Sequence, residues 1–143
     1  MNIDHICIAV RSIQPAAEKF SRLFGYHVRT DVVTNTRQRV NVQFLAKPGS
    51  LDIKLIEPHG EDSPLWPFVK KGGGLHHVCF KTDDTVAACD ELADKGLRVV
   101  TPPEPGEAFD EALIAFCYAG FGLNVEIIDT DRRRALREDC ASE

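Results

Sequence analysis

Two short segments of the chain carry the side chains best suited to chemistry. Residues 4–10 read DHICIAV and residues 76–82 read HHVCFKT, so each has a histidine followed two positions later by a cysteine. Imidazole is both a general base near neutral pH and the commonest protein ligand for metals. We therefore take His5 and His77 as the first candidate residues of a functional site.

The second of these segments begins with two adjacent histidines. Successive side chains of a strand point to opposite faces, so His76 and His77 cannot both face one inner site. The match to His5 assigns His77 to the inside. His76 is then expected on the face that packs on a helix or on the other half of the chain.

An internal repeat extends this match through the chain. A shift of 72 positions (77 − 5) carries His5 onto His77 and aligns residues 39–57 with residues 111–129 without a gap. A shared apolar pattern would explain the periodicity, but not the common register of histidines, cysteines, glycines and closing strands. The repeat predicts two modules that pair about a pseudo-two-fold axis, with equivalent residues facing each other across one cavity.

The closing strand of each module adds one charged residue at this axis. Lys54 and Glu126 are related by the same shift, and Glu126 lies in the otherwise apolar run LNVEII. A carboxylate is costly to bury unless it is paired, which makes Glu126 a strong functional candidate. Together, His5, His77 and Glu126 form a set suited to a divalent metal such as Co, Zn, Mn, Ni or Fe.

Four further residues are expected to line the cavity because they share a strand face with the candidates above. They are Cys7, Cys79, Asp52 and Asn124. Asp52 and Asn124 lie two positions before Lys54 and Glu126, at the cavity mouth. The cysteines are expected to be small core residues at the cavity floor, with a second ligand pair as the alternative.

The elements that position these residues follow one order in both halves. The first half predicts a strand over residues 3–10, a helix from an N-cap at Ser12 to a stop at Gly25, and strands over 26–33, 39–46 and 51–57. The second predicts a strand over 75–82, a helix capped at residues 83–84 and ending at Gly96, and strands over 97–101, 112–118 and 123–129. One domain results: module one over 1–58, a connector with a short helix over 59–74, module two over 75–130, and a polar tail over 131–143.

Two loops and the tail lie outside this repeat. Residues 102–110, rich in proline and acid and including Phe109, could with residues 64–68 form lids over the cavity, or contacts in a dimer. The tail has too few apolar residues to pack firmly. Its basic run at residues 132–134 is interpreted as a solvated face or a fraying helix.

The composition narrows the class of protein. The chain has 143 residues, 43% of them hydrophobic, and a net charge of −5, which is typical of one globular domain and not of a nucleic-acid-binding surface. Five cysteines without tight pair spacing predict reduced thiols. No apolar run is long enough for a transmembrane helix and no signal peptide is evident, so we expect a cytoplasmic protein with no membrane partner.

The chain resembles the vicinal oxygen chelate superfamily, the glyoxalase and bleomycin-resistance fold, and within it the methylmalonyl-CoA epimerases. Residues 4–10, 24–25, 42–45, 55–58, 62–64 and 73–80 carry the resemblance. It implies an α+β fold in which two βαβββ modules form one curved mixed sheet around a central cavity. It also implies metal ligands at positions 5, 54, 77 and 126, a homodimer, and a small-molecule substrate with an acyl-CoA among the candidates.

Position 54 departs from the pattern of the family, because a lysine stands where a carboxylate or amide ligand is expected. An ammonium and a dication repel each other by about 8 kcal/mol at 4 Å and an effective dielectric of 20. Lys54 could swing away from a three-ligand site, or be a neutral amine. The third alternative is that no metal binds and Lys54 forms an ion pair with Glu126 across the axis.

The resemblance suggests proton abstraction next to a thioester or ketone carbonyl, with stabilisation of the enolate, as in epimerases and glyoxalases. Glu126 is the candidate base. A second base would fall on Val42 or Gln43, neither of which is basic, so Lys54 is the candidate for a proton donor or for the enolate-stabilising cation. The alternatives are a metal-free small-molecule binding protein and an Fe(II) dioxygenase with a two-His, one-Glu site.

Overall fold

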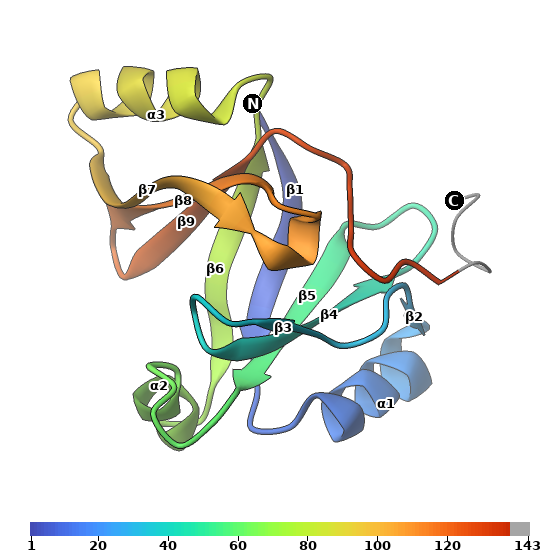
Figure 1. Cartoon of the computed structure of the whole chain (residues 1–143). Helices are drawn as coiled ribbons and strands as arrows, with labels where there is room; N and C mark the ends of the chain where they lie inside the picture. Colours follow the sequence, from blue (N-terminus) through green and yellow to red (C-terminus); the bar gives the residue numbers. More distant parts are fainter. Residues whose placement is uncertain (138–143) are drawn as a thin grey trace.

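The structure is a computed structural model that describes residues 1–137. One curved, open mixed sheet of nine strands organises this part of the chain (Figure 1). The strands are β1 (Asn2–Ala9), β2 (His27–Val28), β3 (Val33–Asn35), β4 (Val40–Ala46), β5 (Asp52–Pro58), β6 (Gly74–Lys81), β7 (Arg98–Gly106), β8 (Ala112–Gly120) and β9 (Leu123–Ile128). The helices are α1 (Ile13–Phe24), α2 (Trp66–Lys70) and α3 (Thr85–Asp94), with one 3₁₀ turn, η1 (Glu107–Phe109).

The strand order repeats on the two sides of the sheet, which runs β2-β4-β5-β1-β6-β9-β8-β7 with β3 as a second partner of β4. The first strands of the two modules, β1 and β6, are antiparallel neighbours at the centre. Each also pairs in parallel with the closing strand of its own module, β5 or β9. This arrangement confirms the predicted fold class.

Successive side chains of the central strands point to opposite faces of the sheet, and the buried apolar residues form three clusters. Helix α1 covers one cluster on its side of the sheet, and α3 covers another on the far module (Figure 1). The third cluster fills the concave side between the modules, with Phe44 and Phe109 among its largest side chains. The candidate site residues lie against this third cluster.

Of the predicted second strand, over residues 26–33, only His27–Val28 forms β2, and β3 begins at its last residue, Val33. The regular pairing of β2 with β4 ends before Thr30. The backbone N–H groups of Arg29 and Thr30 both donate to the carbonyl of Phe44, and the Thr30 hydroxyl accepts from the Phe44 N–H at 3.1 Å. A side chain thus replaces part of the regular ladder, which sequence periodicity does not reveal.

Strand β7 is longer than predicted and includes most of the segment expected to be a loop. It continues through Pro102, Pro103 and Pro105 because it lies at the edge of the sheet and pairs only with β8. A proline has no N–H to donate, so it is tolerated where that donor would face outward. The expectation that Phe109 belongs to a lid or dimer contact is also wrong, because its side chain is buried in the central cluster.

The tail was predicted not to pack firmly, and this is wrong for the residues up to 137. Arg133 is buried, Leu136 forms a β-bridge with Thr30, and the N–H of Arg137 donates to the carbonyl of Arg29. The tail packs through polar contacts, so its low apolar content was a misleading guide. Residues 138–143 of the predicted tail, including Cys140, lie outside the described residues.

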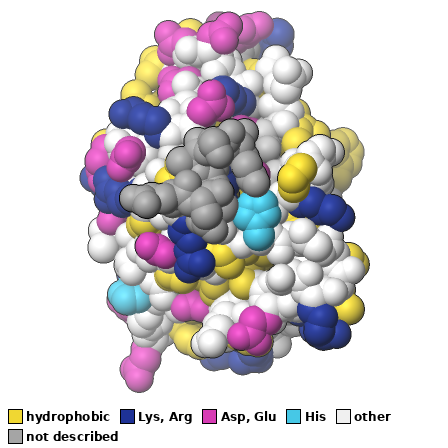
Figure 2. Space-filling view, turned by 90° about the vertical axis from the view of Figure 1, so that its right-hand side faces the viewer, with side chains coloured by type: hydrophobic (Ala, Val, Ile, Leu, Met, Phe, Trp, Pro, Cys, Tyr) yellow, Lys and Arg dark blue, Asp and Glu magenta, His cyan; other side chains and the backbone are white. Residues whose placement is uncertain are grey.

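Charges of both signs are interspersed over the face of the molecule that Figure 2 shows. None of the helices within residues 1–137 combines the length and apolar character needed to cross a membrane. The four described cysteines, Cys7, Cys79, Cys89 and Cys117, are buried free thiols, as predicted.

Gly73, just before β6, approaches the backbone of β1 too closely to carry a side chain. Its φ is +69°, and an added Cβ would lie 2.4 Å from the carbonyl oxygen of Ala9. We expect Gly73→Ala to lower the free energy of unfolding by about 3 kcal/mol, from backbone strain plus this clash. The matched control is Gly122→Ala, with φ +71° and no atom within 4 Å, which we expect to cost about 1 kcal/mol. Urea unfolding would measure both, and equal losses would rule out the clash.

Candidate active site

The central strands bring four predicted residues together at the pseudo-two-fold axis. In the parallel pairs, Lys54 lies opposite Cys7 and Glu126 lies opposite Cys79, so the two closing strands use the same register. The relative exposures of the four residues are 0% for His5, 4% for Lys54, 2% for His77 and 0% for Glu126. Four polar groups at this depth require mutual partners.

Glu126 is the common partner of the other three. Its Oε1 lies 3.1 Å from His5 Nε2 and 3.3 Å from His77 Nε2. The Lys54 ammonium lies 3.4 Å from Oε1 and 3.2 Å from Oε2. The structure therefore has the Lys54–Glu126 ion pair that the sequence left as one of three alternatives.

The ionisation of this cluster follows from its contacts. Burial alone would raise the pKa of Glu126, but the Lys54 ammonium and the two histidine hydrogen bonds hold it well below its usual value. Burial opposes the charge of Lys54 as well, yet the Glu126 carboxylate raises the Lys54 pKa. Burial lowers the pKa of His77 to about 4, against the opposing effect of its hydrogen bond to Glu126. At neutral pH the site thus has a charged lysine, an ionised glutamate and a neutral His77.

His5 is fixed from its other side by residues that the sequence analysis missed. Its Nδ1 lies 2.7 Å from Asp4 Oδ2, and Asp4 Oδ2 accepts from Arg133 Nη2 at 2.5 Å. The Arg133 guanidinium also lies 4.5 Å from the ring centroid of Phe44. Both ring nitrogens of His5 thus face carboxylate oxygens, so both hydrogen bonds form only when both nitrogens carry protons.

The role of Arg133 corrects the interpretation of residues 132–134 as a solvated face or fraying helix. Burial would raise the pKa of Asp4, but its hydrogen bond to His5 and the charge of Arg133 lower it overall. The only available signal in the sequence was the position of Asp4 directly before His5. Nothing in local sequence connects Asp4 to a residue so near the other end of the chain.

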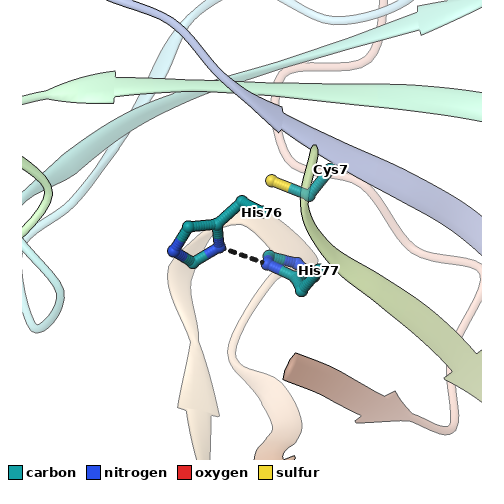
Figure 3. Close-up of side chains that lie close together, drawn as sticks. All are labelled: Cys7, His76 and His77. Carbon is teal, nitrogen blue, oxygen red and sulfur yellow. Dashed lines mark hydrogen bonds between the residues drawn. The ribbon is translucent and has the colours of Figure 1, made fainter. Parts of the chain in front are cut away.

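His76 was expected to face away from the site, and this is wrong. Its Nδ1 lies 2.8 Å from Nδ1 of His77, and Figure 3 shows the two rings turned toward each other beside Cys7. The reason is a β-bulge between β1 and β6. Cys7 pairs with His77 and Ile8 pairs with Leu75, which leaves His76 without an opposite residue. Bulges re-aim side chains and are common next to active sites.

A cavity of about 400 Å³ opens onto one side of the cluster. Its lining includes Lys54, His76, His77, Phe116, Arg37 and Glu104. His5 and Glu126 are not in the lining, whereas Lys54 and His77, which contact Glu126, are. A small molecule in the cavity would therefore meet Lys54 and the histidine pair first.

None of the four residues expected to line the cavity, Cys7, Cys79, Asp52 and Asn124, belongs to its lining. Cys7 and Cys79 are fully buried, and burial raises the pKa of the Cys7 thiol to about 12 and that of Cys79 further. Asp52 accepts from Arg29 Nη1 at 2.7 Å, and Asn124 is half-buried beside His77 in β9. The two cysteines are thus buried core thiols that resist ionisation.

The donor atoms of His5, His77 and Glu126 lie within 4.8 Å of one another, the spacing of a metal ligand set. Asp4 on His5 Nδ1 is also the kind of partner that orients a metal-ligating imidazole. The charge does not suit a dication, because the Lys54 ammonium is bonded to the carboxylate that would hold the ion. As they stand, these residues do not fit a divalent metal.

The two βαβββ modules and the paired central histidines define a class of protein, and comparison with known families agrees. The chain belongs to the glyoxalase/bleomycin resistance protein/dioxygenase superfamily, whose family model matches residues 4–118. Within this superfamily, the chain is similar to methylmalonyl-CoA epimerases.

Three relatives illustrate the similarity. The ethylmalonyl-CoA/methylmalonyl-CoA epimerase of Cereibacter sphaeroides is 34% identical over 72% of this chain and 77% of its own. The mitochondrial methylmalonyl-CoA epimerase of Homo sapiens is 33% identical over 67% of this chain, but the match spans only 54% of that protein. A variant of Streptomyces coelicolor methylmalonyl-CoA epimerase, in complex with 2-nitronate-propionyl-CoA, has a TM-score of 0.78 and 28% identity, covering 92% of this chain and 98% of that chain.

Proposed function

We propose that this protein abstracts a proton from the carbon next to an acyl-CoA thioester carbonyl, with the Lys54 ammonium in place of a metal ion. The observation that carries the proposal is the position of Lys54: charged, in the lining of the cavity, and held by Glu126. The epimerase-like sequence and fold support the reaction class.

Lys54 suits the stabilisation of an enolate oxygen. An ammonium has three N–H donors, and among the described residues its hydrogen bonds go to the two oxygens of Glu126 alone. One donor is therefore free for a carbonyl oxygen in the cavity. A fixed donor in a site with little water stabilises developing negative charge strongly, by about 10²–10³ in rate for one hydrogen-bond donor.

Glu126 has a supporting role in this proposal. Its two oxygens already accept from three side chains, and a carboxylate with a depressed pKa is a weak base. We assign it the task of keeping Lys54 charged and His77 oriented. This role differs from the expectation that Glu126 itself moves the proton. The homodimer and the cytoplasmic location stay predictions.

The acyl-CoA class rests on the relatives. One relative is named for ethylmalonyl-CoA and methylmalonyl-CoA, and one solved epimerase holds 2-nitronate-propionyl-CoA. A cavity of about 400 Å³ is large enough for the acyl group and its thioester. We therefore choose methylmalonyl-CoA as the first probe.

The test is the incorporation of deuterium from D₂O at the α-carbon of methylmalonyl-CoA, in excess EDTA and followed by mass spectrometry. We expect exchange by the parent protein to persist in EDTA. In EDTA, Lys54→Gln should be at least about 100-fold slower, because the amide keeps a hydrogen bond but loses the charge. Lys81→Gln, which changes a partly exposed lysine paired with Asp131, is the matched control and should leave the rate unchanged.

Three outcomes would contradict the proposal in different ways. Exchange that stops in EDTA and returns with Co²⁺ would assign the electrophile to a metal. No exchange, together with aerobic oxygen uptake that depends on Fe(II), would favour the dioxygenase alternative. No exchange, together with a rise in melting temperature on adding acyl-CoA, would favour a binding protein.

A further inference from the structure

Positions 4 and 76 are equivalent under the internal repeat, and the structure gives them equivalent tasks. Ile3 pairs with Phe80 and His5 with Cys79, so Asp4 is the unpaired residue of one register shift, as His76 is of the other. Each bulged residue contacts Nδ1 of the histidine that follows it, at 2.7 Å for Asp4 and 2.8 Å for His76. The two positions differ in chemistry, because one offers a carboxylate and the other an imidazole.

The carboxylate of Glu126 fixes the tautomer of His77, and His77 in turn fixes the tautomer of His76. An ionised carboxylate only accepts, so His77 must donate to it from Nε2. A neutral His77 that donates from Nε2 has a lone pair on Nδ1. The 2.8 Å contact between the two Nδ1 atoms is then a hydrogen bond from His76 to His77. His76 therefore has its proton on Nδ1 and a lone pair on Nε2.

That lone pair is accessible, and it belongs to a residue of the cavity lining. In Figure 3 the second ring nitrogen of His76 points away from His77. Within residues 1–137 this nitrogen has no hydrogen-bond partner. Buried side-chain N and O atoms without a partner are limited there to the Nε atoms of Arg29 and Arg133, so His76 Nε2 is accessible. His76 also belongs to the cavity lining, as does Lys54.

A further contact prepares His76 for proton transfer. The ring of Phe68 packs edge-on against the His76 ring, with centroids 5.1 Å apart, so Phe68 and His77 hold the imidazole between them. His77 cannot take this role itself, because both of its nitrogens are occupied.

We propose that His76 is the general base of the cavity, with Nε2 accepting the α-proton of the substrate. This inference rests on the proposed function and names the base that it needs. The electron pair of the C–H bond forms the C=C bond of the enolate, the carbonyl π pair moves onto oxygen beside Lys54, and His76 becomes an imidazolium. Return of a proton from His76 to the α-carbon restores the thioester and neutral His76, and exchange of that proton with solvent labels the product.

The test compares two substitutions at position 76 in the deuterium assay. In His76→Asn, the amide NH₂ takes the place of the Nδ1 donor to His77 but supplies no base, so we expect exchange at least about 100-fold slower with the same unfolding midpoint. In His76→Ala, added imidazole should restore a measurable part of the lost rate. His59→Gln changes an exposed histidine outside the cavity and should exchange at the parent rate.

Each result decides between the two proposals. Exchange by His76→Asn within about threefold of the parent would overturn the assignment of the base while leaving the proposed function intact. A large loss in Glu104→Gln, with no loss in His76→Asn, would move the base to the cavity carboxylate. No exchange by the parent would end both proposals. Independently of activity, ¹⁵N chemical shifts should show a protonated Nδ1 and an unprotonated Nε2 on His76, and the opposite tautomer would overturn the inference.

Discussion

Replacing Lys54 with methionine is expected to lower the free energy of unfolding by about 3–5 kcal/mol at pH 7.5. Methionine preserves the length and apolar packing of the lysine stem but removes the charge. Glu126 then stays fully buried without its cation, and breaking a buried ion pair by removing one partner typically has this cost. Chemical denaturation of parent and variant measures the difference directly.

The pH dependence of stability should also reverse. In the parent, the pKa of Glu126 is below its unfolded value of 4.5, so its contribution is present above pH 4.5 and is lost as pH falls toward the folded pKa. In Lys54→Met, burial becomes the dominant effect and raises the folded pKa of Glu126 above 4.5. The variant should therefore lose stability as pH rises from about 4.5 to 7.5, where the parent does not.

A double variant separates the charge from the packing. Lys54→Met combined with Glu126→Gln removes both charges and keeps an oxygen that accepts from His5 and His77, so most of the lost stability should return. Lys81→Met, at an exposed ion pair, should change stability by no more than about 0.5 kcal/mol. If the double variant is as unstable as Lys54→Met, the loss is due to packing and not to the uncompensated carboxylate.

Replacing Lys54 with glutamine is expected to convert the site into a metal centre. The change removes the ammonium beside Glu126, and with it a repulsion of about 8 kcal/mol toward a dication at 4 Å and an effective dielectric of 20. It also places an amide oxygen next to His5, His77 and Glu126, whose donor atoms already lie within 4.8 Å of one another. We expect about one Co²⁺ per chain after dialysis, a visible Co²⁺ spectrum and a higher melting temperature with the metal.

The parent protein treated in the same way should retain no stoichiometric metal. A second control adds Glu126→Gln to Lys54→Gln, which removes the one anionic ligand and should abolish retention of Co²⁺. Stoichiometric metal in the parent would mean that Lys54 leaves its position beside Glu126, and it would contradict the role that we propose for the ammonium. Unchanged metal binding in the Lys54→Gln variant would show that charge does not limit this site.

The fold and the meeting of Lys54 with Glu126 were predictable because the repeat preserves register. Parallel pairing of each first strand with its closing strand places positions 54 and 126 opposite the two cysteines, and a shift of 72 positions in sequence corresponds to a two-fold operation in space. The internal symmetry therefore predicts the contact between Lys54 and Glu126, which local secondary-structure propensities do not.

The positions of Asp4 and His76 were not predictable from alternation. A bulge adds one residue to a strand and reverses the expected direction of its side chain, and its location depends on the partner strand. The prolines of β7 misled in a related way, since a proline marks a loop only where its missing donor would be needed. Arg133 was missed because its partner is a charge and not an apolar surface.

The bond between Arg133 and Asp4 has a consequence for the order in which the molecule can form. It joins positions 129 residues apart, and the bond from His5 to Glu126 joins positions 121 residues apart. Closing loops of this length is entropically costly and comes late. During synthesis, the first strand must wait for almost the whole described chain before His5 has both of its carboxylate contacts in place. The buried cluster around Glu126 is thus among the last parts of the molecule to form. It can form only after the two modules have packed against each other.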